Sequence, residues 1–221
     1  DRQREGGGFG WYNPQTGEMD GFWQPQFEDY RIFWTASANK GRYILLSTVH
    51  TDSDAGRLFC WDTEQHEIIY SIAPPSGSVT TGPIAEAFPG LMIGYARTSD
   101  DQGLLYGFKA EDGEILWTKN VPLAPMTDIS HVRRHQFAFR KGSDDNIWAF
   151  MNSTLARIDP SNIEVTPIGN AYPAQIAFAG GNVYMAGGSA LRRILNLHTS
   201  DDRPPQSPVN LVASSEQGTV D

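Results

Sequence analysis

The chain has 221 residues, of which 39% are apolar and 11% aromatic, enough for a packed core. Its formal net charge of −9 argues against a nucleic-acid-binding protein, because phosphate recognition needs clustered Lys and Arg. The single cysteine, Cys60, excludes an intrachain disulfide and a CxxC metal site. Its place in the apolar run RLFCW predicts a buried, unreactive thiol. No stretch approaches the roughly 20 apolar residues that cross a bilayer, so we expect no membrane span.

The first 23 residues predict a short tail and a hairpin. Residues 1–8 read DRQREGGG, a composition typical of a flexible segment. Two strand-like segments follow within residues 9–23, and the turn YNPQTGE lies between them, from Tyr12 to Glu18.

Four groups of strand-like segments follow, separated by Gly, Pro and Asp turns. The first three groups have four segments each and the last has three. They lie at 31–36, 42–49, 57–61 and 67–73; at 79–87, 91–96, 104–109 and 114–119; at 136–140, 146–151, 155–159 and 163–167; and at 175–179, 182–185 and 191–195. No helical period competes with this pattern.

One segment of the chain recurs. Thr51, Asp54, Gly56, Leu58, Phe59 and Trp61 reappear 47 positions later as Thr98, Asp101, Gly103, Leu105, Tyr106 and Phe108. The turn at 12–18 recurs at 61–67, 108–114 and 158–164. A strand repeat of this period predicts an all-β protein, a β-propeller of radially arranged, four-stranded antiparallel blades. We expect about four blades over residues 9–197, with Leu58, Leu105 and Leu155 at equivalent positions.

The hairpin GLLYGFKAEDGEILW, from Gly103 to Trp117, resembles the repeat of the quinoprotein (PQQ-like) β-propeller superfamily. The match is looser in the other copies, and Asp144 to Trp148 (DDNIW) is similar instead to lyase-type and gluconolactonase-type propellers. The resemblance implies a structural Trp117 between blades. The quinone-dependent enzymes carry a vicinal disulfide, which one cysteine cannot form, so we expect no quinone cofactor.

Residues 198–221 differ in composition from the repeat. The run PPQSPVNLVA, from Pro204 to Ala213, resembles a Pro-rich linker and the first strand of a fibronectin type III domain. We therefore expect a fragment, or one processed chain, of a larger secreted protein. A second chain or a missing segment would then cover the open edges of the propeller. The alternative is a closed four-bladed ring, in which the amino-terminal hairpin completes the last blade.

The candidate site is one end of the central channel. In a propeller, the loops entering each innermost strand share a face with the loops joining the second strand to the third. Projecting the expected strands onto this rule brings together these polar residues: Tyr30, Arg31, His50, Arg97, Asp128, His131, Arg133, Arg134 and His135. Alternation along an extended segment would send His131, Arg133 and His135 the same way. The same sequence also fits a solvated loop whose His and Arg side chains pair with nearby carboxylates.

Three classes of function stay open. The first, which we favour, is a non-catalytic module that binds a glycan or protein partner, using His50, Arg31, Arg97, Asp128 and Arg134. The second is a polysaccharide lyase acting on uronate-containing chains. There, Arg133 would bind the carboxylate while His131, His135 or Tyr30 abstracts the neighbouring proton. The third is a structural or assembly repeat. In each case we expect an extracellular or cell-surface location.

Two acidic runs suggest calcium. The runs Asp52-x-Asp54-x-Gly56 and Asp101-x-Gly103 supply two or three oxygens each, whereas Ca²⁺ takes six to eight. Because the runs recur at the same blade position, turn capping explains them better. We therefore expect no cofactor, with calcium as the alternative.

Overall fold

The computed structural model describes residues 8–22, 25–50, 56–99, 102–121, 138–142, 144–151, 154–170, 175–179, 182–187 and 190–194. A hairpin comes first, formed by β1 (Phe9–Tyr12) and β2 (Met19–Phe22). Blade 1 contains β3 (Tyr30–Ala38), β4 (Tyr43–His50), β5 (Gly56–Asp62) and β6 (Glu67–Ile72). Blade 2 contains β7 (Ser78–Phe88), β8 (Leu91–Thr98), β9 (Gly103–Lys109) and β10 (Ile115–Val121). Blade 3 contains β11 (Ala138–Lys141), β12 (Ile147–Met151), β13 (Thr154–Asp159) and β14 (Glu164–Asn170). Blade 4 contains β15 (Gln175–Ala179), β16 (Asn182–Gly187) and β17 (Ala190–Ile194).

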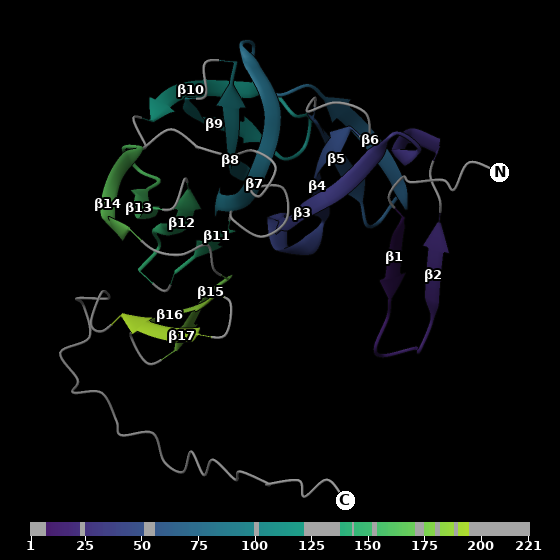
Figure 1. The fold of residues 1–221 in the computed structure, drawn as a ribbon. Helices are drawn as coiled ribbons and strands as arrows, with labels where there is room; N and C mark the ends of the chain where they lie inside the picture. The colour runs from purple at the N-terminus through teal and green to yellow at the C-terminus, as the bar shows by residue number, and fades with distance from the viewer. Residues whose placement is uncertain are drawn as a thin grey trace, which may run out of the picture.

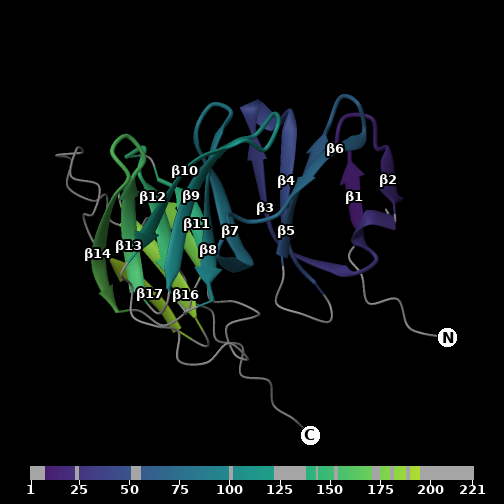
Figure 2. The ribbon, with the colours of Figure 1, turned by 90° about the horizontal axis from the view of Figure 1, so that it is seen from above.

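Each sheet is an antiparallel meander, with strands hydrogen-bonded in chain order. Figure 1 shows the sheets arranged as an arc, with the hairpin at one end and blade 4 at the other. Consecutive first strands contact one another, β3 with β7, β7 with β11 and β11 with β15, so the first strand of each blade is innermost. The view from above shows the hairpin standing beside blade 1 (Figure 2). The expected propeller is therefore confirmed.

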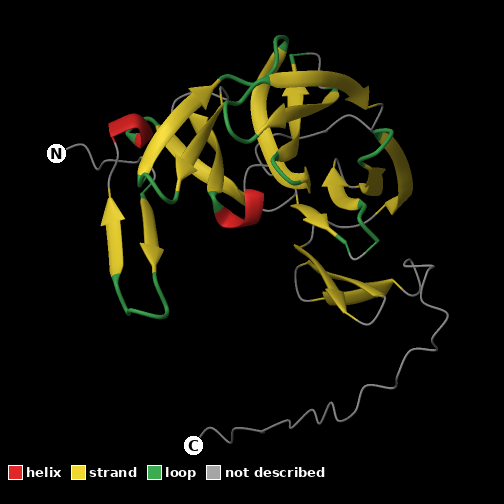
Figure 3. Cartoon of the chain, turned by 180° about the vertical axis from the view of Figure 1, so that it is seen from behind, coloured by secondary structure: helices red, strands yellow, loops and turns green. Residues whose placement is uncertain are grey.

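Helix plays a minor part in the described residues. The two 3-10 helices η1 (Pro25–Phe27) and η2 (Asn39–Gly41) flank β3 (Figure 3). No helix in these ranges is long and apolar enough to cross a membrane.

The core consists of layers between successive sheets. Between blades 1 and 2, Leu58 and Cys60 pack with Tyr106 and Phe108. The layer between blades 2 and 3 has Leu105, Ile147, Ala149 and Ile158 among its members. The layer between blades 3 and 4 includes Trp148, Phe150, Leu155 and Val183. Leu58, Leu105 and Leu155 all lie buried on the third strand of their blade and face the blade that follows.

The repeated turn has the same backbone in all four copies. The residue before the copy's Glu has a positive φ in each: 78° at Gly17, 57° at His66, 76° at Gly113 and 59° at Ile163. In three copies the second residue, Asn13, Asp62 or Asp159, accepts the backbone N–H group two residues later. In blade 2 the second residue is Lys109, and Asp112 accepts the N–H group of Glu114 instead. Such Asx turns stabilise a tight reversal locally, which explains why the turn was visible in the sequence.

Polar contacts join β4, the second strand of blade 1, to β7, the innermost strand of blade 2. Ser47 Oγ donates to the Gly82 carbonyl at 2.7 Å, and Thr81 Oγ1 donates to the Thr48 carbonyl. Gly56 is required at this approach, since a Cβ there would lie 2.4 Å from Thr81 Oγ1 and 2.6 Å from the Thr48 carbonyl oxygen. The two blades therefore approach closely where β4 and β5 of blade 1 meet β7 of blade 2.

The left-handed position of Ile163 generates a stability prediction. A branched side chain in this region costs about 1–2 kcal/mol, a penalty that glycine does not have. We expect Ile163→Gly to raise the free energy of unfolding by about 1 kcal/mol, measured by urea denaturation.

The matched substitution is Gly113→Ala, at the equivalent position of blade 2. It should lower the free energy of unfolding, because the new Cβ would lie 2.8 Å from a ring carbon of Tyr70. Destabilisation by Ile163→Gly would contradict the assignment of strain to this turn.

Candidate functional site

The predicted loop face is present at the same end of blades 1 and 2. Tyr30, which begins β3, pairs with His50, which ends β4. Ser78 and Thr98 pair at the matching place in blade 2, and Arg97 lies next to them, opposite Thr80. The fold thus brings Tyr30, Arg31, His50 and Arg97 to one end of neighbouring blades.

Tyr30 and His50 take part in packing. The Tyr30 ring meets the His50 ring edge to face, with centroids 5.3 Å apart, and it meets Phe59 in the same way at 5.5 Å. Tyr30 also packs against the buried cluster of Phe27, Leu46 and Phe59. These contacts fix its ring in an apolar layer, and its assignment as a proton-abstracting group stays a prediction.

The two arginines differ in their access to solvent. Arg31 is exposed at the start of β3, whereas Arg97 has only 6% of its surface exposed. Of the two, Arg31 is therefore the more accessible to a ligand. Arg97 is buried beneath the same end of blade 2.

The densest polar cluster of the sequence falls outside the described ranges. Asp128, His131, Arg133, Arg134 and His135 lie between β10 and β11, in the stretch 122–137. Within the described ranges, no three or more His, Cys, Asp and Glu side chains are placed to hold a metal. The acidic positions 52, 54 and 101 lie outside these ranges. The predictions of catalysis by the histidines and of calcium binding therefore stay predictions.

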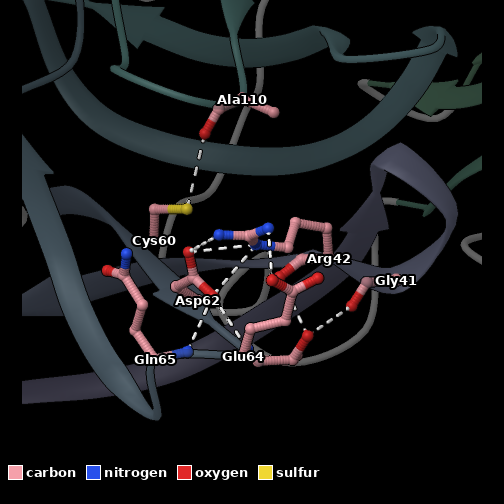
Figure 4. Close-up of polar contacts among 8 residues, drawn as sticks. Gly41, Arg42, Cys60, Asp62, Glu64, Gln65 and Ala110 are labelled. Atoms are coloured by element: carbon pink, nitrogen blue, oxygen red, sulfur yellow. Dashed lines mark hydrogen bonds and ion pairs between the residues drawn. The ribbon is translucent and has the colours of Figure 1, made fainter.

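A different polar cluster, missed by the sequence reasoning, lies at the opposite end of blade 1 (Figure 4). Arg42 Nε bonds both carboxylate oxygens of Asp62 at 3.1 Å, and Nη2 bonds one of them at 2.9 Å. Arg42 Nη1 lies 2.6 Å from Glu64 Oε2. Asp62 also accepts the backbone N–H groups of Glu64 and Gln65. The sequence signal for this cluster was Asp62 near the start of the repeated turn, but its partner Arg42 lies 20 residues away.

This Arg42–Asp62 cluster has a structural role. Asp62 has 2% of its surface exposed, so its charge needs a partner. Hydrogen bonds from Arg42, supported by the two backbone N–H groups, lower the pKa of Asp62 to about 2. The cluster ties the connection between β3 and β4 to the turn between β5 and β6.

Cys60 lies in the layer between blades 1 and 2. Its Sγ donates to the Ala110 carbonyl at 3.4 Å, and Tyr70 Oη donates to the same oxygen at 2.9 Å. Burial raises the pKa of the Cys60 thiol to about 12. The buried position expected from the sequence is confirmed, and the thiol is unsuited to nucleophilic chemistry.

Comparison with known proteins supports the fold. No protein-family model and no curated protein sequence matches the chain. Solved structures do match, among them the β-propeller domain of Cps50 (Swd1) from Myceliophteria thermophila, with 14% identity and a TM-score of 0.54. This match covers 88% of the chain and 61% of that domain.

Two further structures agree. The WD40 domain of Toxoplasma gondii coronin matches with 9% identity and a TM-score of 0.55, over 85% of this chain and 50% of that one. A protein from Lactobacillus plantarum matches with 10% identity and a TM-score of 0.53, over 84% of this chain and 60% of that one. The chain thus spans less than two thirds of each of these proteins, and the likeness extends to fold alone.

The lowered pKa of Asp62 predicts a pH dependence. A group whose pKa is depressed on folding contributes stability that is complete above its unfolded value, about 3.9, and is lost as the pH falls toward about 2. Urea denaturation should show Asp62→Asn less stable than the parent at pH 7. The difference should shrink between pH 5 and pH 3. A difference that is constant over this range would contradict the ion pair.

The buried thiol predicts slow labelling. In the folded chain, Cys60 should react with a disulfide reagent such as DTNB at least a hundredfold more slowly than in urea, because burial denies both access and ionisation. Release of thionitrobenzoate at 412 nm (the reagent's absorption) measures both rates. Rapid labelling before unfolding would show that the layer between blades 1 and 2 opens readily.

Proposed function

We propose that this chain is a non-catalytic β-propeller module that binds a carboxylate-bearing glycan through the face carrying Arg31. The observation that carries the proposal is the shared placement of Arg31, His50 and Arg97 at one end of two neighbouring blades. All three lie at strand ends beside connecting loops, and loops on a rigid scaffold are the usual location of binding residues.

The chemistry of the described residues favours binding over catalysis. Arg31 is exposed and offers the planar fork of donors that matches a carboxylate. Tyr30 meets His50 edge to face and packs against an apolar cluster, so the pair suits the wall of a shallow site. A general base would instead need to reach a substrate proton.

Several further expectations belong to this proposal. We infer that the repeat is of the quinoprotein type without a quinone, and that residues 198–221 begin a fibronectin type III-like domain. The repeated Asx turn with a positive φ before Glu supports a common origin of the blades. We also infer an extracellular or cell-surface location, and calcium stays the alternative to a site without cofactor.

Calorimetric titration with oligogalacturonate, a uronate oligomer, tests the proposal. We expect Arg31→Ala to weaken binding about tenfold or more, since a hydrogen bond to a charged group contributes about 1.5–3 kcal/mol. The titration should be performed at about 0.1 M salt, where the net negative charge of the chain is screened beyond about 10 Å.

Two controls sharpen the result. Lys109→Ala removes a cation at the opposite end of blade 2, where it pairs with Glu114, and should leave the affinity unchanged. A neutral galactan should not bind. Equal losses from both substitutions, or no binding by the parent, would contradict the proposed face.

A lyase would show itself separately. Incubation with polygalacturonate or alginate would then give unsaturated product absorbing in the ultraviolet. Turnover that disappears when His131 and His135 are both replaced by Ala would replace the binding module with the enzyme.

A further inference from the structure

A cross-strand pair near the turn of the β1–β2 hairpin is exposed, unlike its counterparts in the blades. Each pair joins the residue that begins the repeated turn to the residue after the copy's Glu. The four pairs are Tyr12–Met19, Trp61–Ile68, Phe108–Ile115 and Ile158–Val165. Tyr12 is 60% exposed and Met19 75%, whereas Trp61 is 2% exposed and Phe108 and Ile158 are fully buried.

In blades 2 and 3 this pair is the surface that meets the preceding blade. Phe108 and Ile115 belong to the layer that contains Leu58 and Cys60 of blade 1. Ile158 and Val165 belong in the same way to the layer that contains Leu105 of blade 2. Tyr12 and Met19, which we call the head surface, therefore form half of a blade junction.

The other half of the junctions between blades 1 and 2 and between blades 2 and 3 includes two alanines on the innermost strand of the preceding blade. Ala36 and Ala38 of blade 1 lie in the same layer as Phe108. Ala85 and Ala87 of blade 2 lie in the same layer as Ile158. The side chains of these alanines leave room for the large apolar pair of the following blade.

Blade 4 exposes this second half. Ile176 and Phe178 of β15 pack against blade 3, so the alternating positions, Ala177 and Ala179, point away from it, and both are exposed. Tyr184 pairs with Ala177 across the sheet and continues the same face. We call Ala177, Ala179 and Tyr184 the tail surface.

We propose that the head surface of one copy of this chain docks on the tail surface of a second copy. The two surfaces have the composition that occurs together in the layers between blades 1 and 2 and between blades 2 and 3. Within one copy they lie at the two ends of the arc (Figure 1), so the second copy supplies the missing half. Such a contact is heterologous and generates a ring or an open row of copies.

Sedimentation equilibrium on the full 221-residue chain tests the proposal. The average mass should rise with concentration above the 24.4 kDa of one copy. Met19→Glu in the head and Ala179→Arg in the tail should each weaken association at least tenfold. Leu116→Lys, which changes an apolar residue that is 44% exposed and outside both surfaces, should leave it unchanged. Circular dichroism verifies that each variant is folded.

Mixing the variants distinguishes head-to-tail docking from other contacts. Met19→Glu keeps a working tail and Ala179→Arg a working head, so an equal mixture should form a complex of two chains although each variant alone is monomeric. A symmetric interface would not be restored by mixing. A parent that is monomeric at every concentration overturns the proposal. Closure within one chain would be shown if Met19→Glu lowered the stability of that monomer.

Discussion

The structure depends on one constraint: each four-stranded sheet is apolar on both faces and needs a neighbour on each side. Within blade 2, Leu105 faces blade 3 while Tyr106 and Phe108 face blade 1. Burial of apolar side chains at roughly 25 cal/mol per Å² makes the stacking of sheets the main source of stability. No single blade can satisfy this requirement, so the repeat produces an array of blades.

The polar interactions fix geometry that the apolar layers leave open. Apolar contacts are non-directional, so two sheets could slide past one another. The bond from Tyr70 Oη to the Ala110 carbonyl aligns the outer strand of blade 1 with the turn of blade 2. Lys119 Nζ bonds the Ile163 carbonyl in the same way between blades 2 and 3. The repeated turn is thus also a docking point for the preceding blade.

The sequence was informative where structure is determined locally. The turn from Trp61 to Glu67 depends on the side chain of Asp62 and on one residue of positive φ, both within seven residues, so the repeat and the blades could be predicted. The Arg42–Asp62 pair could not be predicted, because it depends on how close two turns come to each other in the folded structure. Tyr30 was assigned from its place in the chain, which determines the end of the blade but not the packing of its ring against Phe59. The histidines at 131 and 135 lie outside the described residues.

The contacts between blades 1 and 2 also determine how the arc responds to force. Hydrogen bonds from Ser47 and Thr81 cross the junction where β4 meets the innermost strand β7, and Tyr70 bonds across it at its outer edge. A hinge between the two blades would need one side of the junction to open, and here hydrogen bonds cross the junction on both sides. Torque applied to either blade is therefore transmitted to the other, and the two blades move as one rigid body. The spacing between Arg31 and Arg97, one on each blade, is consequently set by the scaffold before any ligand arrives.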